Sequence, residues 1–259
     1  MWWDLYDALI DGIPSAYTAD DLFCGATEAL VRSGENVGLC YLTELDTRPP
    51  LFPHRRASMP LRALAALVKS WNYAEASLGL AAINSYYNTP AVAVRNGVEL
   101  SEARFAEDRK NDPFIAYQQA IRDKKVVVIG HFHLLEELFA PVCELYVMED
   151  EPTEDGDYPC TAAEYLLPDC DFVFISCGAV TDKSLPRFLA LAQNAYVVVV
   201  GPSTPMAPVL FEYGVNDLAG FIVKDPALAF EVAAGREVGK IYATGQKVSL
   251  KKDTARLPR

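Results

Sequence analysis

The chain has 259 residues, of which 51% are hydrophobic, and it carries a formal net charge of -12. This length and composition predict a globular protein with a well-buried core, arranged as one large domain or two smaller ones. The negative charge argues against nucleic acid and against an anionic membrane surface as partners, because both require a basic face.

The amino terminus predicts no export signal. Residues 1–7 lack the positive flank and long apolar core of a secretory signal, and no run approaches the roughly 20 apolar residues of a bilayer span. The six cysteines show no Cys-x-x-Cys spacing, which favours reduced thiols over a disulfide framework or a zinc ribbon. We therefore expect a cytoplasmic protein.

In the amino-terminal half, hydrophobic periodicity predicts short elements of mixed type. In chain order they are a helix over 2–12, a β-hairpin or meander over 21–42, a surface loop to Pro60, and two helices over 61–87 that break near Trp71. Residues 91–123 are charged and irregular, and they predict a linker and a short helix. We place the boundary between two domains near residue 121.

The carboxyl-terminal half alternates predicted strands and helices. Strands are expected at 125–129, 144–149, 171–176, 196–200, 220–223 and about 240–250, and helices at 133–140, 184–193, 206–213 and 226–234. Runs of β-branched residues at 126–129 and 197–200 are typical of strands buried on both faces. The alternation favours a mostly parallel sheet in a Rossmann-like domain over 122–252, followed by a flexible tail over 253–259.

Ligands of open α/β sheets bind outside the carboxyl ends of the strands. His131 and His133 follow the first strand of this domain, and Cys177 follows the third, between Ser176 and Thr181. Imidazole and thiol groups bind transition metals, so His131, His133 and Cys177 are candidate metal ligands. The alternatives are that His131 caps the next helix, that His133 packs on its surface, and that Cys177 is a buried structural thiol.

The loop after the strand at 125–129 could instead belong to a dinucleotide-binding site. Such a site requires Gly-x-Gly-x-x-Gly, yet the chain offers Gly130 alone, followed by bulky residues that include Phe132. Glu149, at the end of the second strand, stands where an acid would meet a ribose, or it begins a solvated acidic run.

The loop after the strand at 196–200 carries the strongest local signal for ligand binding. Three prolines stiffen residues 201–208, while Gly201, Pro202, Ser203 and Thr204 offer backbone and hydroxyl groups at the start of the next predicted helix. This arrangement suits a polar or anionic group at a helix amino terminus. The alternative is a proline-braced turn with an ordinary cap.

Four segments together resemble the hallmark of a known family. They are Gly-Pro-Ser-Thr-Pro at 201–205 with the following 207–214, and residues 24–27, 77–84 and 128–132. Over residues 1 to about 252 the chain resembles the "Putative heavy-metal chelation" family, a domain of unknown function.

The resemblance implies an amino-terminal α+β domain over 1–121, similar to the small capping domain of enolase, joined to the Rossmann-like domain with a site between them. It adds three amino-terminal contributors to that site: Gly25, Thr27 and Asn84. It implies no enolase chemistry, because the chain lacks the acidic metal ligands of a barrel domain.

Three hypotheses of different classes follow. The leading one is a protein that binds a transition metal or a small metal-chelating molecule in the interdomain cleft, with or without enzymatic processing. The second is an enzyme that uses a nucleotide-like cofactor, NAD or S-adenosylmethionine, in a degenerate Rossmann crevice. The third is a non-catalytic, homo-oligomeric binding protein whose apolar amino-terminal face contains Trp2, Trp3 and Tyr6.

Overall fold

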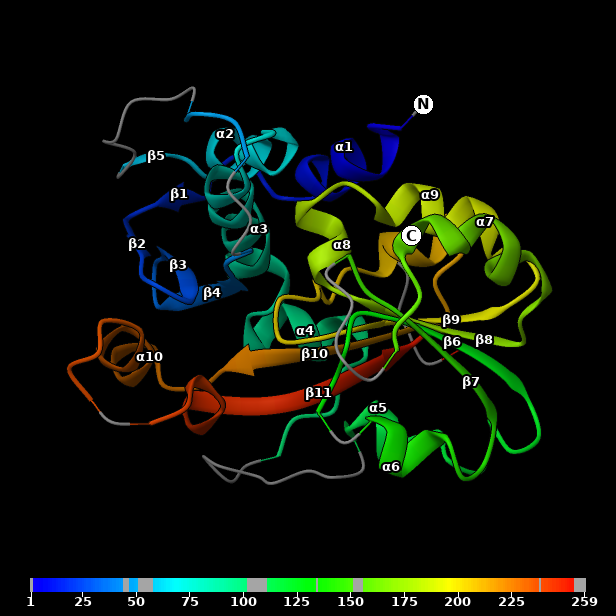
Figure 1. Cartoon of the computed structure of the whole chain (residues 1–259). Coiled ribbons are helices and arrows are strands. Elements are labelled where there is room, and N and C mark those ends of the chain that lie inside the picture. The colour runs from blue at the N-terminus through cyan, green and yellow to red at the C-terminus, as the bar shows by residue number, and fades with distance from the viewer. Residues whose placement is uncertain are drawn as a thin grey trace.

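The chain folds into an amino-terminal unit, α1 to α4, and a carboxyl-terminal unit, α5 to β11 (Figure 1). A computed structural model describes residues 2–43, 47–50, 58–101, 111–133, 135–150, 156–237 and 239–253. The amino-terminal elements are α1 (Asp4–Asp11), β1 (Thr18–Ala19), β2 (Asp21–Cys24), β3 (Glu28–Ser33), β4 (Asn36–Tyr41), β5 (Met59–Pro60), α2 (Leu61–Ala65), the 3-10 helix η1 (Ala66–Lys69), α3 (Tyr73–Tyr87) and α4 (Pro90–Asn96).

The carboxyl-terminal unit alternates strands with short helices. Its elements are α5 (Pro113–Ala116), β6 (Lys125–Ile129), α6 (Leu135–Phe139), β7 (Glu144–Met148), η3 (Cys160–Ala162), α7 (Ala163–Leu166), η4 (Leu167–Asp169), β8 (Phe172–Ser176), α8 (Gly178–Thr181), α9 (Leu185–Leu191), β9 (Tyr196–Val200), η5 (Pro208–Tyr213), β10 (Asp217–Val223), α10 (Pro226–Ala233), η6 (Ile241–Thr244) and β11 (Gly245–Lys251).

In the amino-terminal unit, the antiparallel meander β2-β3-β4 packs on α3. The side chain of Asn72 caps α3 by accepting a hydrogen bond from the backbone N–H of Glu75, at 2.9 Å. A Cβ at Gly38 in β4 would overlap backbone atoms of Ala81 and Ser85. Glycine at this position therefore lets the strand lie directly against the backbone of the helix.

The six-stranded sheet has the order β11-β10-β9-β8-β6-β7. Neighbouring strands from β7 to β10 run parallel, and β11 pairs antiparallel with β10 at the edge. The chain moves outward from β6 to β7 and then returns to add β8 on the other side of β6. The winding order therefore reverses between β6 and β8, and in open α/β sheets ligands bind at such a point.

Both faces of this sheet are covered, as the β-branched runs predicted. Val127 and Val173 face a large apolar cluster that includes residues of the amino-terminal unit. Val126 and Val128 face the opposite cluster, which includes Phe139 of α6. Figure 1 shows α5 and α6 on one side of the sheet and α7 and α9 on the other. The predicted fold class, a small α+β unit followed by a Rossmann-like unit, is confirmed.

Several predicted elements differ from the structure, and two of them bear on the site. The helix expected over 206–213 is the six-residue 3-10 helix η5, because Ala207 precedes Pro208 and is extended, with φ -105° and ψ 108°. The strand expected from 240 begins only at Gly245, after η6. Parts of the predicted surface loop, of the linker over 91–123 and of the tail lie outside the described residues. The domain boundary at residue 121 stays a prediction.

The contact between the units includes an aromatic residue that was predicted to form an exposed face. Tyr6 is fully buried, and its hydroxyl donates to the carbonyl of Val180 at 3.1 Å. Tyr6 therefore packs α1 onto the carboxyl-terminal unit, whereas Trp2 is 65% exposed. Among the described residues, none of the helices has both the length and the hydrophobicity needed to span a bilayer.

Candidate functional site

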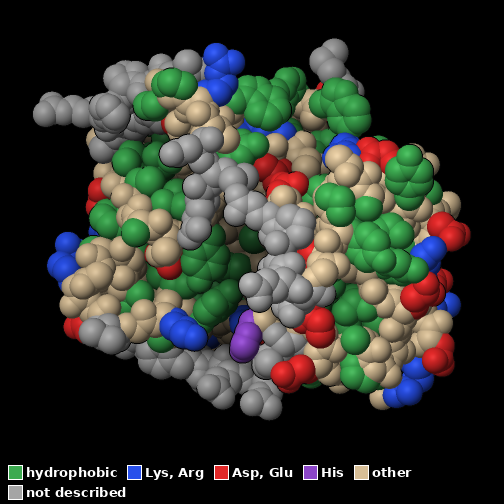
Figure 2. Space-filling model, in the orientation of Figure 1, with side chains coloured by type: hydrophobic (Ala, Val, Ile, Leu, Met, Phe, Trp, Pro, Cys, Tyr) green, Lys and Arg blue, Asp and Glu red, His purple; other side chains and the backbone are tan. Residues whose placement is uncertain are grey.

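The carboxyl ends of β6, β8 and β9 open into a cleft between the two units. It consists of three adjoining cavities with volumes of about 240, 340 and 660 Å³, here called the small, middle and large cavities. The middle cavity shares Phe132, Gly201 and Pro202 with the small one, and Ser176 and Gly178 with the large one. Figure 2 shows a hollow between the two halves of the molecule.

The loop after β6 is held in place by Glu149, at the end of β7. Oε2 of this carboxylate accepts a hydrogen bond from the backbone N–H of His131 at 2.9 Å, and Oε1 accepts one from that of Asp150 at 3.0 Å. Gly130 has a φ of +100°, and a Cβ there would lie 2.9 Å from Cβ of Ser176. Glycine therefore lets the tips of β6 and β8 approach. The position of Glu149 is explained by this loop without a bound ribose.

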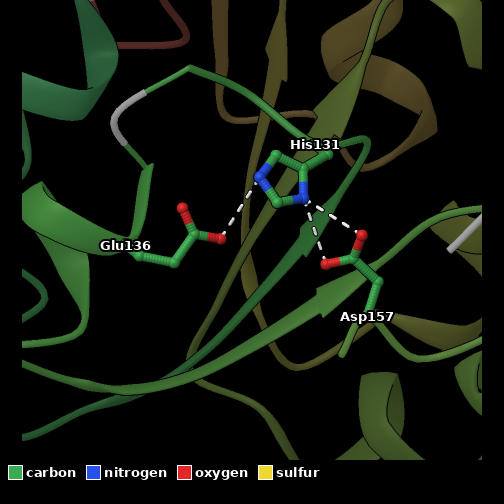
Figure 3. Close-up of side chains that lie close together, drawn as sticks. All are labelled: His131, Glu136 and Asp157. Carbon is green, nitrogen blue, oxygen red and sulfur yellow. Dashed lines mark hydrogen bonds and ion pairs between the residues drawn. The ribbon is translucent and has the colours of Figure 1, made fainter. Parts of the chain in front are cut away.

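His131 lies between two carboxylates, as Figure 3 shows. Nδ1 is 3.0 Å from Oδ2 of Asp157, and Nε2 is 3.4 Å from Oε1 of Glu136 in α6. The Asp157 side chain is 2% exposed, whereas that of Glu136 is 44% exposed. Within the described part of the chain, these residues are the one group of three or more His, Cys, Asp or Glu whose ligand atoms all lie within 4.8 Å of one another.

The two ring nitrogens give the carboxylates different roles. Because Asp157 is the closer and more buried partner, we assign the ring proton to Nδ1, which leaves the lone pair on Nε2. Two ligands bound to Zn²⁺ at about 2.0–2.1 Å with tetrahedral angles are about 3.4 Å apart. That spacing matches the one between Nε2 of His131 and Oε1 of Glu136. These two residues fit a borderline divalent ion, and Asp157 orients the ring.

The other two predicted metal ligands lie apart from this cluster. His133 is exposed and lines the small cavity. Cys177 is 6% exposed and lines the middle cavity. The structure thus groups His131 with the carboxylates of Glu136 and Asp157, which were not among the predicted site residues, rather than with His133 and Cys177.

The loop after β9 is a bridge between the two units. Nδ2 of Asn84 in α3 donates to the carbonyls of Leu39, at 2.8 Å, and of Ser203, at 2.9 Å. Nδ2 of Asn88 donates to the carbonyl of Thr204 at 2.9 Å. Of the predicted ligand-binding residues in this loop, three line the cleft, namely Gly201, Pro202 and Ser203. Thr204 is fully buried, and Ala207, the residue before η5, is extended rather than helical.

The remaining predicted site residues are divided between two regions. Thr181 lines the middle cavity, and its hydroxyl donates to the carbonyl of Gly178 at 2.8 Å. Gly25 and Thr27 lie in the turn between β2 and β3, and neither lines any of the three cavities. The N–H of Gly25 donates to the carbonyl of Glu28 at 2.8 Å, which closes that turn.

The residues that the amino-terminal unit and η6 contribute to the middle cavity were not predicted from the sequence. Cys40 and Tyr41 come from β4, and Tyr242 comes from η6. Burial raises the pKa of Cys40 to about 12 and that of Tyr41 to about 12, so both are neutral at pH 7. The sequence carried no signal for Cys40, because a thiol in an apolar strand resembles any small core residue. All six cysteines are free in the structure.

The fold and site define an α/β protein with a cleft of ligand size between an α+β unit and a Rossmann-like sheet. The sequence profile of the DUF364 family, described as "Putative heavy-metal chelation", matches residues 112–251. The profile of DUF4213, which bears the same description, matches residues 6–87. The chain therefore belongs to the DUF364 family.

Two solved structures resemble the whole chain. A protein of unknown function from the DUF364 family of Desulfitobacterium hafniense DCB-2 is 50% identical, with a TM-score of 0.89 over 97% of this chain and 99% of that one. Another, from Pyrococcus horikoshii, is 20% identical, with a TM-score of 0.71 over 97% of this chain and 100% of that one, and it shows the fold alone. No curated protein matches the chain.

Proposed function

We propose that the protein binds a divalent transition metal ion, delivered with a small chelating molecule, at the edge of the interdomain cleft. The observation that carries this proposal is the 3.4 Å spacing between Nε2 of His131 and Oε1 of Glu136. The loop that holds His131 also lines the cleft, because Gly130 lines the large cavity and Phe132 lines the other two. An imidazole with a carboxylate suits Zn²⁺, Ni²⁺, Co²⁺ or Fe²⁺.

The donor set favours a chelated ion over a bare one. Protein sites for such ions use three or four side-chain ligands, whereas His131 and Glu136 provide two, with Asp157 turned to the far side of the ring. The remaining coordination positions then belong to another molecule. The large cavity, of about 660 Å³, lies next to this loop and has room for a small chelator.

Titration of the metal-free chain with Co²⁺, alone and as its citrate complex, tests this proposal by calorimetry and visible absorption. We expect tighter binding of the complex, and affinity losses of about tenfold or more for His131→Gln and Glu136→Gln. Asp157→Asn should cost about 10- to 100-fold, as for other carboxylates that orient a ligating histidine.

The matched control is His133→Gln, an exposed histidine in the same loop, which should leave the affinity unchanged. The proposal fails if the wild-type chain binds no stoichiometric Co²⁺, Ni²⁺ or Zn²⁺, free or chelated. It also fails if the His133 variant loses as much affinity as the His131 variant.

A nucleotide-like cofactor is a second candidate, favoured by the position of the large cavity at the reversal between β6 and β8. Glu149, Asp150 and Asp182 line this cavity. Their carboxylates repel the phosphates of NAD but attract the sulfonium group of S-adenosylmethionine. We therefore expect a thermal shift with S-adenosylmethionine rather than with NAD, and flat melting curves with both would remove this candidate.

A further inference from the structure

Two thiols from different units line the middle cavity of the cleft. Cys40 comes from β4 and Cys177 follows β8, and they are 1% and 6% exposed. Of the described residues that line this cavity, none carries a carboxylate, an imidazole, an amine or a guanidinium group. Its polar groups are thiols, hydroxyls and backbone atoms, a donor set different from that around His131.

Ser203 lines the same cavity as the two thiols. Its Oγ accepts a hydrogen bond from the backbone N–H of Tyr41, the residue after Cys40, at 2.8 Å. Burial raises the pKa of both thiols, and the same hydroxyl acts in the opposite direction on each of them. Both thiols therefore lie beside the loop that holds Ser203, at the contact between the units.

Hydrogen-bond donors gather around the sulfur of Cys177. Burial raises the pKa of this thiol, and the backbone N–H and the hydroxyl of Ser203 act in the opposite direction. The hydroxyl of Thr204 acts in the same direction, and its Oγ1 is buried without a hydrogen-bond partner in the described structure. Such donors stabilise negative charge on sulfur.

Gly201 allows the loop after β9 to approach the sulfur of Cys177 closely. Its φ is +131°, and a Cβ at this position would overlap the sulfur of Cys177. The glycine of the Gly-Pro-Ser-Thr-Pro segment thus brings the loop directly onto the thiol.

We propose that Cys40 and Cys177 bind a soft monovalent metal ion, of which Cu(I) is the biological example, in the middle cavity. Thiolate ligands select Cu(I), whereas carboxylate and imidazole groups suit harder or borderline ions. Binding replaces two S–H bonds by two Cu–S bonds and releases two protons, and copper keeps its oxidation state. The bound centre carries one net negative charge, which the donors from Ser203 and Thr204 stabilise.

This inference goes beyond the proposed function, since it uses other residues and another class of ion. The test is an anaerobic titration of the full, reduced, metal-free chain with Cu(I) against a chromogenic Cu(I) chelator. We expect one equivalent bound, and at least a hundredfold loss of affinity in Cys40→Ser and in Cys177→Ser. Cys170→Ser is the matched control, because this buried thiol donates to the carbonyl of Leu167, away from the cleft, and its loss should leave the affinity unchanged.

X-ray absorption on the copper-loaded wild-type chain provides a readout that needs no variant. Two sulfur neighbours and no nitrogen neighbour are expected. Nitrogen or oxygen neighbours, no binding by the wild-type chain, or unchanged affinity in the double variant of Cys40 and Cys177 would overturn the inference. If the chain binds Co²⁺ through His131 but does not bind Cu(I), this inference alone is refuted. If it binds Cu(I) but does not bind Co²⁺, only the proposed function is refuted.

Discussion

The hydroxyl of Ser203 accepts a hydrogen bond from the backbone N–H of Tyr41, with 2.8 Å between oxygen and nitrogen. This bond ties the loop after β9 to the end of β4. The side-chain amides of Asn84 in α3 and of Asn88, just after α3, donate to carbonyls of the same loop. Directional hydrogen bonds therefore set the relative position of the two units around the cleft, in addition to apolar burial.

Ser203→Ala should destabilise the protein, because the partly buried N–H of Tyr41 loses its acceptor. A loss of about 1–3 kcal/mol in the free energy of unfolding is expected, measured by urea denaturation. Thr27→Ala, at an exposed position in the amino-terminal unit, should stay within about 0.5 kcal/mol of the wild type. Equal effects of the two substitutions would contradict this account of the bridge.

Asn84→Asp should cost more, because it replaces the amide that donates to two buried carbonyls by a carboxylate that cannot donate. We expect a loss of about 3–5 kcal/mol in the free energy of unfolding, the range for an uncompensated buried charge. Asn111→Asp is the matched control, since that amide also donates to a carbonyl, of Lys247, at the surface. Its expected loss is below about 1 kcal/mol, and an equal loss in both variants would refute the prediction.

Gly201→Ala should be destabilising for two separable reasons, its positive φ and the overlap of the new Cβ with the sulfur of Cys177. A total of about 2–4 kcal/mol is expected from backbone strain and overpacking. Gly235→Ala is the control, because Gly235 also has a positive φ, of +68°, but has open space around it. This substitution should lower the free energy of unfolding by about 1–2 kcal/mol.

A double-mutant cycle separates the two causes. In a Cys177→Ala background the overlap disappears, so Gly201→Ala should retain only its backbone cost. Additive effects of the two substitutions in urea denaturation would show that the sulfur does not restrict this position.

The acid dependence of stability should carry a contribution from Asp182. Burial raises the pKa of this carboxyl, whose Oδ1 accepts hydrogen bonds from the backbone N–H and the hydroxyl of Ser184, at 2.7 and 2.6 Å. The folded state therefore holds a proton that the unfolded state has released. As pH rises from the unfolded pKa of about 4 through the raised pKa, this group lowers the free energy of unfolding.

Urea denaturation across this acidic range should show the effect as a difference between the wild type and Asp182→Asn. The wild type should lose stability relative to the variant as pH rises. Asp171 provides a control of opposite sign, because the backbone N–H of Lys125 holds its pKa low, so its contribution disappears as pH falls. A pH-independent difference for Asp182→Asn would contradict the assignment.

The positions of His131 and Cys177 at strand ends followed from the sequence. Buried strands of a parallel sheet place their carboxyl ends at one edge, so residues just after them belong to one region of the surface. The partners of His131 did not follow in the same way. Asp157 stands in an acidic run typical of a solvated surface, yet its side chain is 2% exposed. The sequence alone does not show whether a carboxylate faces water or an imidazole.

The sequence by itself determined most of the strands and helices and the order of the two units. Each element must bury an apolar face, and this requirement gives its sequence a regular hydrophobic period. Only the tertiary structure decided that Cys40 lines the same cavity as Cys177 and that Asn84 holds the loop at Ser203. These contacts join residues far apart in the chain. They depend on how the two units dock onto each other. The hydrophobic pattern within one segment of the sequence carries no information about that docking.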